Sequence, residues 1–326
     1  MSQKLLITGG AGFIGSVLTA YLLDHGYEVV VVDDLSTGHS KAIDSRATLI
    51  QASILDKPAL IEALMGVNTV IHCAAKSLVK ESVSSPELYS QVNTEGTSVL
   101  LEAMNEAGVL NTIFSSTAAV YGDSKIQPIL ESGEINPVNP YGKSKIEAEQ
   151  LISEFCSNGF AAITFRYFNV AGSYQSSTGQ LHIEDHKNET HLIPKIMKSH
   201  IKNKEKIQVE IYGDSWPTKD GSCIRDYLHV ADLAHAHLLA LNALKAGENQ
   251  VFNLGSGIGY SVFEVINEIE NVVEGKFSKV ITPNRPGDPP ALLADIDKAR
   301  KELGWLPKAN LNQIIFDSWQ AAKQLG

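Results

Sequence analysis

Tyr141 and Lys145 are the residues whose types and spacing best fit acid and base chemistry. They lie in the segment PYGKSK, residues 140–145, and a spacing of four places both side chains on one face of a helix. A free tyrosine titrates near pH 10, so a tyrosine that acts as a base near neutrality needs its pKa lowered by roughly three units. The ammonium of Lys145 and a second nearby cation would favour the phenolate. Taken alone, the same spacing also fits a pair on a helix surface.

A glycine-rich turn near the N-terminus has the pattern of a dinucleotide-binding site. Residues 8–15 read TGGAGFIG, which contains GxGxxG and the overlapping GxxGxxG between a predicted strand and a predicted helix. Glycines there let the backbone approach a pyrophosphate, whose charge meets the N–H groups that open the helix. Asp33, at the end of the next predicted strand, fits a carboxylate that binds both ribose hydroxyls. Asp33 and Asp34 would repel a 2′-phosphate, so the pattern predicts NAD, whose oxidised nicotinamide is the second cation that Tyr141 needs.

Strand and helix patterns alternate through the first half of the chain, which predicts repeated βα units. Strands are expected at residues 5–8, 28–33, 48–51, 69–73, 112–116 and 162–167, and helices at 14–25, 58–65, 86–107 and 141–155. Continuous apolar strands imply burial on both faces, so we predict an α/β fold, a Rossmann-type doubly wound parallel sheet with a smaller mixed α/β domain.

The predicted boundary between the two domains lies where the βα rhythm stops. After residue 169 a polar segment, 172–190, precedes helices and strands without regular alternation. A helix pattern at 230–244 and a short strand at 251–254 would return to the first sheet. The NAD-binding domain is therefore expected at 1–169 plus about 228–256, and the second domain at 170–227 and 257–326.

Composition excludes several classes of partner. The chain has 326 residues, with 27 Lys and Arg against 37 Asp and Glu, and a formal net charge of −10. A nucleic-acid partner usually selects a basic surface, so none is expected, and an anionic ligand would need a locally basic pocket. Three dispersed cysteines form no CxxC pair, and no apolar run reaches the roughly 20 residues of a membrane span. We expect a cytoplasmic protein with no membrane partner.

Longer segments make the chain resemble the extended short-chain dehydrogenase/reductases, and within them the 4-epimerases of UDP-hexoses, nearly from end to end. These segments are FSSTAAVYG at 114–122, RYFNVAG at 166–172 and WPTKDGSCIRDYLHV at 216–230. The resemblance implies that Thr117 hydrogen-bonds the reacting sugar oxygen while Tyr141 takes its proton, assisted by Lys145. The C4 hydride would pass to a retained NAD and return to the other face of a 4-keto sugar.

The resemblance also assigns binding residues. The cofactor residues it implies are Gly9, Gly12, Phe13, Ile14, Gly15, Asp33, Ser53, Asn93, Tyr141, Lys145 and Phe168. The substrate residues it implies are Thr117, Asn169, Leu192, Tyr212, Arg225, Arg285, Asp288 and Leu292. Two arginines suit a diphosphate, a tyrosine offers an aromatic surface to uracil, and an aspartate accepts from a ribose hydroxyl. The family further implies a homodimer through helices within 86–107 and 141–155.

Four positions depart from the family pattern. Ser53 stands where an aspartate often contacts adenine, and Ser77, beside Lys76, stands where some members have a lysine. Trp216 replaces the usual tyrosine before Pro217. Leu292 falls where members restrict or admit a bulky 2-substituent, and it is smaller than the tyrosine of strictly hexose-specific members. We therefore expect UDP-N-acetylhexosamines to be accepted as well.

Other functions remain open from the sequence alone. The 4,6-dehydratases of nucleotide sugars place acidic residues directly after the Thr117 equivalent, whereas this chain has Ala118 and Ala119. A UDP-glucuronate decarboxylase or epimerase is not excluded, nor is a nonenzymic sensor of NAD or UDP-sugars. The direction of the reaction cannot be derived from the residues.

A polar segment before residue 192 contains several possible metal ligands. These are His182, Glu184, Asp185, His186 and His191, which match no ordered zinc motif such as HExxH. The segment is predicted as a solvated or substrate-covering loop, and no metal is expected.

Overall fold

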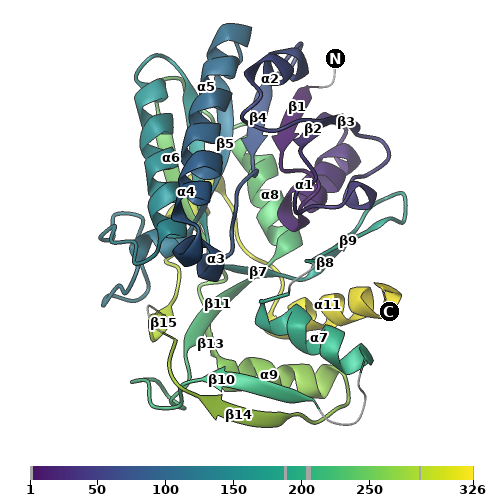
Figure 1. The fold of residues 1–326 in the computed structure, drawn as a ribbon, viewed down its shortest axis with the longest axis vertical. Helices are drawn as coiled ribbons and strands as arrows, with labels where there is room; N and C mark the ends of the chain where they lie inside the picture. Colours follow the sequence, from purple (N-terminus) through teal and green to yellow (C-terminus); the bar gives the residue numbers. More distant parts are fainter. Residues whose placement is uncertain (1–2, 187–188, 203–206, 286–287, 326) are drawn as a thin grey trace.

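A seven-stranded parallel sheet forms the centre of the larger lobe (Figure 1). The computed structural model of the protein describes residues 3–186, 189–202, 207–285 and 288–325. Within them the strand order is β12-β6-β5-β4-β1-β2-β3, which confirms the predicted Rossmann-type fold and the return of the chain to the first sheet. The strands are β1 (Lys4–Thr8), β2 (Glu28–Asp33), β3 (Thr48–Gln51), β4 (Thr69–His72), β5 (Asn111–Thr117), β6 (Ala161–Tyr167) and β12 (Asn249–Leu254).

Helices cover both faces of this sheet because its strands are apolar on both sides. Successive side chains of a strand point to opposite faces, so Leu5 and Ile7 of β1 join one core while Leu6 joins the other. The first core is covered by α1 (Phe13–Asp24), α8 (Val230–Ala240) and α10 (Asp297–Leu303). The second is covered by α2 (Lys57–Ala63), α5 (Gly96–Ala107) and α6 (Pro140–Cys156). The sheet is thus a rigid platform whose strand ends can hold reactive groups.

The predicted helix at 86–107 is interrupted. It consists of α4 (Pro86–Tyr89), a π-helical segment η2 (Ser90–Glu95) and α5, and it follows a helix that was not predicted, α3 (Val79–Ser84). Apolar spacing does not distinguish a π-helical turn from an α-helical one, so the π segment could not be predicted from the sequence. Such segments often occur at functional sites, and this one carries Asn93. Two short 3-10 helices, η1 (Ser40–Ala42) and η3 (Ala118–Tyr121), complete this lobe.

The smaller lobe is mixed α/β, as predicted. One sheet contains β7 (Asn169–Ala171), β11 (Ile224–His229), β13 (Gly259–Ser261) and β15 (Ala291–Leu292). The pairs are β10 (Gln208–Tyr212) with β14 (Ser278–Thr282), parallel, and β8 (Ser173–Gln175) with β9 (Leu181–Ile183), antiparallel. Its helices are α7 (Leu192–Lys202), α9 (Val262–Val272) and α11 (Leu311–Leu325), and their apolar faces share one core with β10. None of the helices described in the structure is both long and apolar enough to cross a bilayer.

One part of the predicted domain division needs correction. Residues 297–305 were assigned to the second domain, but Ala299, Leu303 and Trp305 belong to the core of the large sheet. The fully buried Trp305 donates from Nε1 to the carbonyl oxygen of Asp232 on α8, at 2.8 Å. This segment packs on the large sheet because α8 and β12 leave an apolar surface there, although its neighbours along the chain belong to the smaller lobe. The remaining boundaries stay a prediction.

Candidate active site

The glycine-rich turn lies at the point where the strand order reverses between β1 and β4. In open α/β sheets, ligands bind outside the carboxyl ends of the strands at this point. Gly9 has φ +72°, and a Cβ there would lie 2.6 Å from the backbone nitrogen of Ala74, just after β4. A Cβ on Gly15 would lie 2.1 Å from the carbonyl oxygen of Gly9. Glycine is therefore required at both positions, because the turn after β1 closely approaches both the backbone after β4 and the first turn of α1.

The start of α1 is open to an anionic group. Gly12 is its N-cap and provides no side-chain cap, so backbone N–H groups of the first turn are left for a ligand. Phe13 and Ile14 follow in that turn and pack partly against the first core. Together with the close-packed glycines, this geometry fits the pyrophosphate of a dinucleotide.

Gly15→Ala is expected to lower both the stability of the protein and its content of bound NAD. The new methyl group would meet the Gly9 carbonyl, and overpacking of this kind costs about 1–3 kcal/mol. The matched control is Gly12→Ala, because its Cβ would have its nearest protein atom at 3.4 Å. We expect the control to keep the wild-type Tm and to change NAD content alone. Equal Tm values for the Gly15 variant and the wild type would contradict the packing argument.

Asp33 ends β2 and is tied to the glycine-rich turn. Its Oδ2 accepts from the backbone N–H of Ala11 at 2.9 Å, and its Oδ1 from that of Leu35 at 2.8 Å. Burial raises the pKa of Asp33, and the charge of Asp34 adds to this rise. Each carboxylate oxygen retains a lone pair, so the predicted contacts with ribose hydroxyls stay possible. Ser53 lies further along this edge, where its Oγ accepts from the N–H of Leu55 at 3.2 Å.

Asn93 acts first as a cross-link within the protein. Its Oδ1 accepts from the N–H of Lys76 at 2.8 Å, and its Nδ2 donates to the Lys76 carbonyl at 3.0 Å and to Ser144 Oγ at 2.9 Å. Both amide hydrogens are used, so Asn93 can contact a cofactor only as an acceptor. Lys76 itself reaches Ser36 Oγ beyond β2, at 3.3 Å. Ser77, which occupies the position of the lysine found in some family members, is exposed. The neighbouring Lys76 reaches across this edge instead, so it is the residue available for the cofactor-phosphate contact that the sequence left unassigned.

Thr117, Tyr141 and Lys145 meet at the carboxyl end of β5. Thr117 ends that strand, while Tyr141 and Lys145 lie in the first turns of α6, whose N-cap Asn139 accepts from the N–H of Gly142 at 2.8 Å. The Thr117 hydroxyl lies close enough to that of Tyr141 to favour the Tyr141 phenolate. Lys145 is only 3% exposed, and its Nζ lies 4.6 Å from the centroid of the Phe114 ring. The structure therefore brings together the three side chains predicted to be catalytic.

The electrostatics of these groups differ from the expected lowering of the tyrosine pKa. Burial raises the pKa of Tyr141, and the hydrogen bond to Thr117 opposes this only in part. Burial also lowers the pKa of Lys145 to about 8, against the opposing influence of Cys73 and Glu149. In the protein alone, desolvation of the phenolate outweighs the influence of Thr117. The second cation inferred from the sequence is therefore a requirement for a basic Tyr141.

A buried ion pair beneath these residues was not predicted. Glu149 accepts from Arg166 Nη2 at 2.6 Å and from Ser116 Oγ at 2.5 Å. The Arg166 side chain continues to the hydroxyl of Tyr121 at 2.9 Å, and both charged side chains are 6% exposed. This network joins α6 to β5 and β6 next to Lys145 and Thr117. Arg166 lies in the segment 166–172, which was noted for its family resemblance. Its ion pair with Glu149 joins two separate elements and could not be predicted from that segment.

Arg225, Asp288 and Leu292 form one group of predicted substrate residues. Leu292 of β15 pairs in register with Arg225 of β11. Arg225 Nη1 donates to the carbonyl oxygens of Ile224 at 2.8 Å and Pro289 at 2.9 Å, and Nη2 lies 3.9 Å from Asp288 Oδ1. Backbone carbonyls thus fix the guanidinium and leave its other edge for an anion.

Tyr212 and Arg285 form a second group. The Arg285 guanidinium lies 3.6 Å from the centroid of the Tyr212 ring, a cation–π contact. The ring face expected to meet uracil is therefore covered on one side, and a base would stack on the other face or on the guanidinium. Of the remaining predicted contacts, Asn169 pairs with Tyr227 in β7–β11, Leu192 begins α7, and Phe168 is buried with Tyr121.

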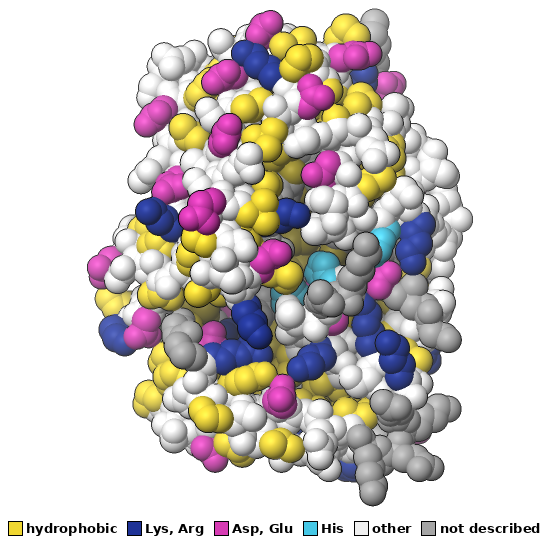
Figure 2. All heavy atoms as spheres, viewed as in Figure 1, with side chains coloured by type: hydrophobic (Ala, Val, Ile, Leu, Met, Phe, Trp, Pro, Cys, Tyr) yellow, Lys and Arg dark blue, Asp and Glu magenta, His cyan; other side chains and the backbone are white. Residues whose placement is uncertain are grey.

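The surface between the lobes has the charge that an anionic ligand requires. Figure 2 shows a hollow between the larger and the smaller lobe, with Lys and Arg side chains gathered along its lower edge. The chain as a whole is acidic, with a formal net charge of −10. Basic side chains are thus concentrated at the hollow, as binding of an anionic ligand by an acidic protein requires.

A model of the NAD dependent epimerase/dehydratase family matches residues 5–255. The chain belongs to this family. This confirms the resemblance to extended short-chain dehydrogenase/reductases and the expected cofactor, NAD. A UDP-glucose 4-epimerase of Corynebacterium glutamicum is 42% identical over 326 residues, 99% of this chain and 97% of that protein.

Solved structures of this family share the whole architecture. A UDP-glucose 4-epimerase from Bifidobacterium longum in complex with NAD+ and UDP has a TM-score of 0.92 at 33% identity, covering 99% of this chain and 98% of that one. A UDP-Glc/GlcNAc 4-epimerase from Campylobacter jejuni has a TM-score of 0.84 at 35% identity, covering 99% of this chain and 100% of that one.

Proposed function

We propose that this family member interconverts UDP-galactose and UDP-glucose by NAD-dependent epimerisation at C4. The observation that carries the proposal is the placement of Thr117 beside Tyr141, with Lys145 on the same helix as Tyr141, at the edge of the sheet that holds the glycine-rich turn. The acid/base pair and the cofactor site thus share one edge of the sheet, as a reversible oxidation of a sugar alcohol requires.

The residues divide the work of the reaction. Tyr141 accepts the proton of the sugar 4-hydroxyl, while Thr117 hydrogen-bonds the same oxygen and orients it. Lys145 favours the phenolate by its charge. Bound NAD supplies reversible acceptance of the C4 hydride. After the 4-keto sugar turns over, Tyr141 returns the proton, so the reaction leaves no net change in redox state.

Incubation with UDP-galactose, without added nicotinamide cofactor, tests the proposal. We expect UDP-glucose as the product, identified by NMR, and about one NAD per chain released on denaturation. No conversion even after supplementation with NAD would overturn the proposal. A parallel incubation with UDP-glucuronate tests the alternative, because loss of carbon dioxide would identify a decarboxylase.

We also propose that UDP-N-acetylhexosamines are substrates. Leu292 is half-buried next to Arg225, and the structurally similar Campylobacter jejuni enzyme is described as acting on both kinds of sugar. Leu292→Tyr should lower kcat/KM for UDP-N-acetylglucosamine at least about tenfold, since a steric clash costs about 1–3 kcal/mol. Turnover of UDP-galactose should change less than about threefold. Leu292→Met is the control, and equal losses on both sugars would contradict the assignment.

A cytoplasmic homodimer is the state we propose for the protein. Helices α5 and α6 lie side by side on one face of the large sheet (Figure 1), and Val99, Leu151 and Phe155 keep part of their apolar surface exposed there. The three cysteines are unpaired, which fits a reducing compartment. Light scattering of the purified protein should give twice the chain mass, and a monomer mass would contradict the proposal.

A further inference from the structure

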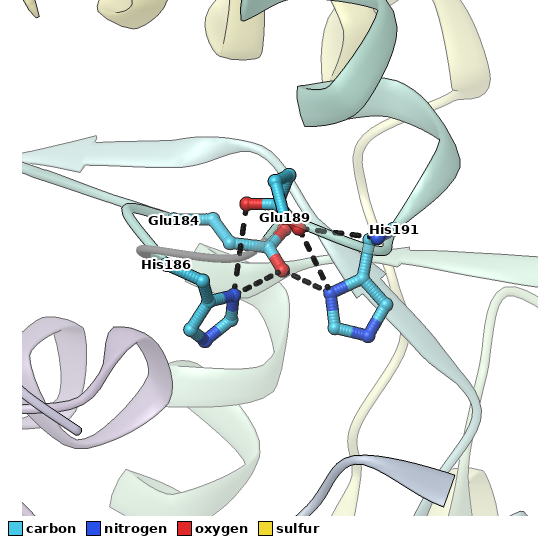
Figure 3. Close-up of side chains that lie close together, drawn as sticks. All are labelled: Glu184, His186, Glu189 and His191. Carbon is cyan, nitrogen blue, oxygen red and sulfur yellow. Dashed lines mark hydrogen bonds and ion pairs between the residues drawn. The ribbon is translucent and has the colours of Figure 1, made fainter. Parts of the chain in front are cut away.

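Four side chains that the proposed reaction does not use converge in the segment between β9 and α7. They are Glu184, His186, Glu189 and His191, and each offers one nitrogen or oxygen atom within 4.8 Å of the others. Figure 3 shows both imidazole rings turned with one nitrogen toward the two carboxylates. No metal was expected here, because the spacing of these residues along the chain matches no ordered zinc motif. The structure brings the residues together between the end of β9 and the start of α7.

The separations between these atoms suit ligands of a single ion. His186 Nδ1 lies 3.3 Å from Glu184 Oε1 and 3.6 Å from Glu189 Oε2. His191 Nδ1 contacts Glu184 Oε1 and lies 3.6 Å from Glu189 Oε1. In a tetrahedral zinc site with ligands at about 2.0–2.1 Å, neighbouring donor atoms are about 3.4 Å apart. Three of the separations are therefore close to those of a tetrahedral site, and all four donor atoms lie within 4.8 Å of one another.

The charge of the cluster also calls for a cation. The carboxylates of Glu184 and Glu189 are each only 7% exposed, and buried carboxylates are costly without positive partners. Doubly protonated imidazoles are one source.

If both imidazoles are protonated, the hydrogen bonds and charges of these four side chains are poorly balanced. Two N–H groups would converge on one oxygen of Glu184, and two charged rings would lie 5.7 Å apart between centroids. The buried Nδ1 of His186 and Oε2 of Glu189 have no hydrogen-bond partner. A divalent cation uses lone pairs of both imidazoles and balances both carboxylates. One ion thus replaces two like charges and satisfies both unpartnered atoms.

Neighbouring groups leave room for an ion. Lys198 Nζ lies 3.6 Å from Glu189 Oε2, but its closer contacts are Asp185 Oδ1 and the His186 carbonyl, both at 3.2 Å. Glu184, His186 and Glu189 line a cavity of about 740 Å³, which provides an entry path.

We propose that Glu184, His186, Glu189 and His191 bind one divalent transition-metal ion, with zinc as the preferred metal. Two imidazole nitrogens and two carboxylate oxygens form a donor set suited to zinc. The ion would tie the end of β9 to the start of α7. His182 and Asp185, which stand in the same sequence segment, are not ligands. His182 is buried next to Asp44 and Arg46, and Asp185 pairs with Lys41 and Lys198.

Zinc titration of the full-length protein, stripped with a chelator and dialysed, tests the proposal. In competition with a chromophoric chelator, we expect one Zn²⁺ per chain, bound with a submicromolar Kd. His186→Ala with His191→Ala should weaken binding at least about a hundredfold, since even supporting residues of metal sites matter ten- to a hundredfold. Co²⁺ in the wild type should give the spectrum of a tetrahedral complex. Zinc should raise the Tm of the wild type and not that of the double variant.

His25→Gln is the matched control, because His25 is an exposed histidine at the end of α1. It should retain wild-type affinity. If the double variant does not fold, Glu189→Gln provides the same comparison with little change of shape. Absence of saturable binding in the wild type, or equal binding by wild type and variants, would overturn the proposal. These measurements use no enzymatic activity, so they are independent of the proposed epimerisation.

Discussion

Tyr141→Phe is expected to lower kcat for UDP-galactose by about a thousandfold while leaving bound NAD in place. General acid–base catalysis contributes about a hundred- to ten-thousandfold, and the variant removes the only proposed proton acceptor. The ring remains, so its edge-to-face contact with Tyr89, at 6.3 Å between centroids, is preserved. Steady-state kinetics and the NAD content of the denatured protein are the two measurements.

The control for this prediction is Tyr89→Phe. The Tyr89 hydroxyl lies 2.7 Å from the carbonyl oxygen of Leu78 and 2.9 Å from Glu81 Oε2, either of which can accept its one hydrogen, and it takes no part in the proposed proton transfer. We expect its kcat to stay within about threefold of the wild type. If Tyr141→Phe keeps the wild-type rate, another group must carry the proton. Loss of NAD from the Tyr141 variant would instead assign this residue to cofactor binding.

The parts of the fold and site that the sequence predicted correctly depend on local patterns. The central strands β1, β2 and β4 are nearly continuous apolar runs, because both of their faces are buried, and the ends of the strands fall within a few residues of the expected positions. The turn at residues 8–15 and the spacing of Tyr141 and Lys145 are also local. Each requires only the strand or helix on which it lies.

The features that the sequence missed depend on contacts between distant segments. Arg285 covers Tyr212 because β14 pairs with β10 in parallel, with Thr282 opposite Tyr212. Such a register cannot be read from either strand alone. Lys76 likewise reaches Ser36 only because the ends of β2 and β4 lie at one edge of the sheet.

The cluster at residues 184–191 was missed for a related reason. Motifs such as HExxH assume one helix, whereas Glu184 follows β9, His191 precedes α7, and their side chains are in contact. Spacing along the chain excluded the ordered motifs correctly, but it could not exclude a site formed between a strand and a helix.

Arg166→Met should destabilise the protein by about 3–5 kcal/mol, because it leaves the Glu149 carboxylate buried without its partner. The double variant with Glu149→Met should recover much of this loss, since it removes both charges. Chemical denaturation and the Tm are the measurements.

Helix α6, which carries Glu149, also supplies the control for this prediction. Lys143 is 72% exposed and pairs with Glu147 at 3.9 Å, so Lys143→Met should cost less than about 1 kcal/mol. If Arg166→Met lowers the free energy of unfolding no more than Lys143→Met does, burial does not make the Arg166–Glu149 pair more important to stability than an exposed pair. If the double variant is as unstable as Arg166→Met, the loss comes from packing around Tyr121 instead of the unpaired charge. A lower kcat in the double variant at unchanged NAD content would show that the ion pair also positions Lys145 and Thr117, which lie directly above it on α6 and β5.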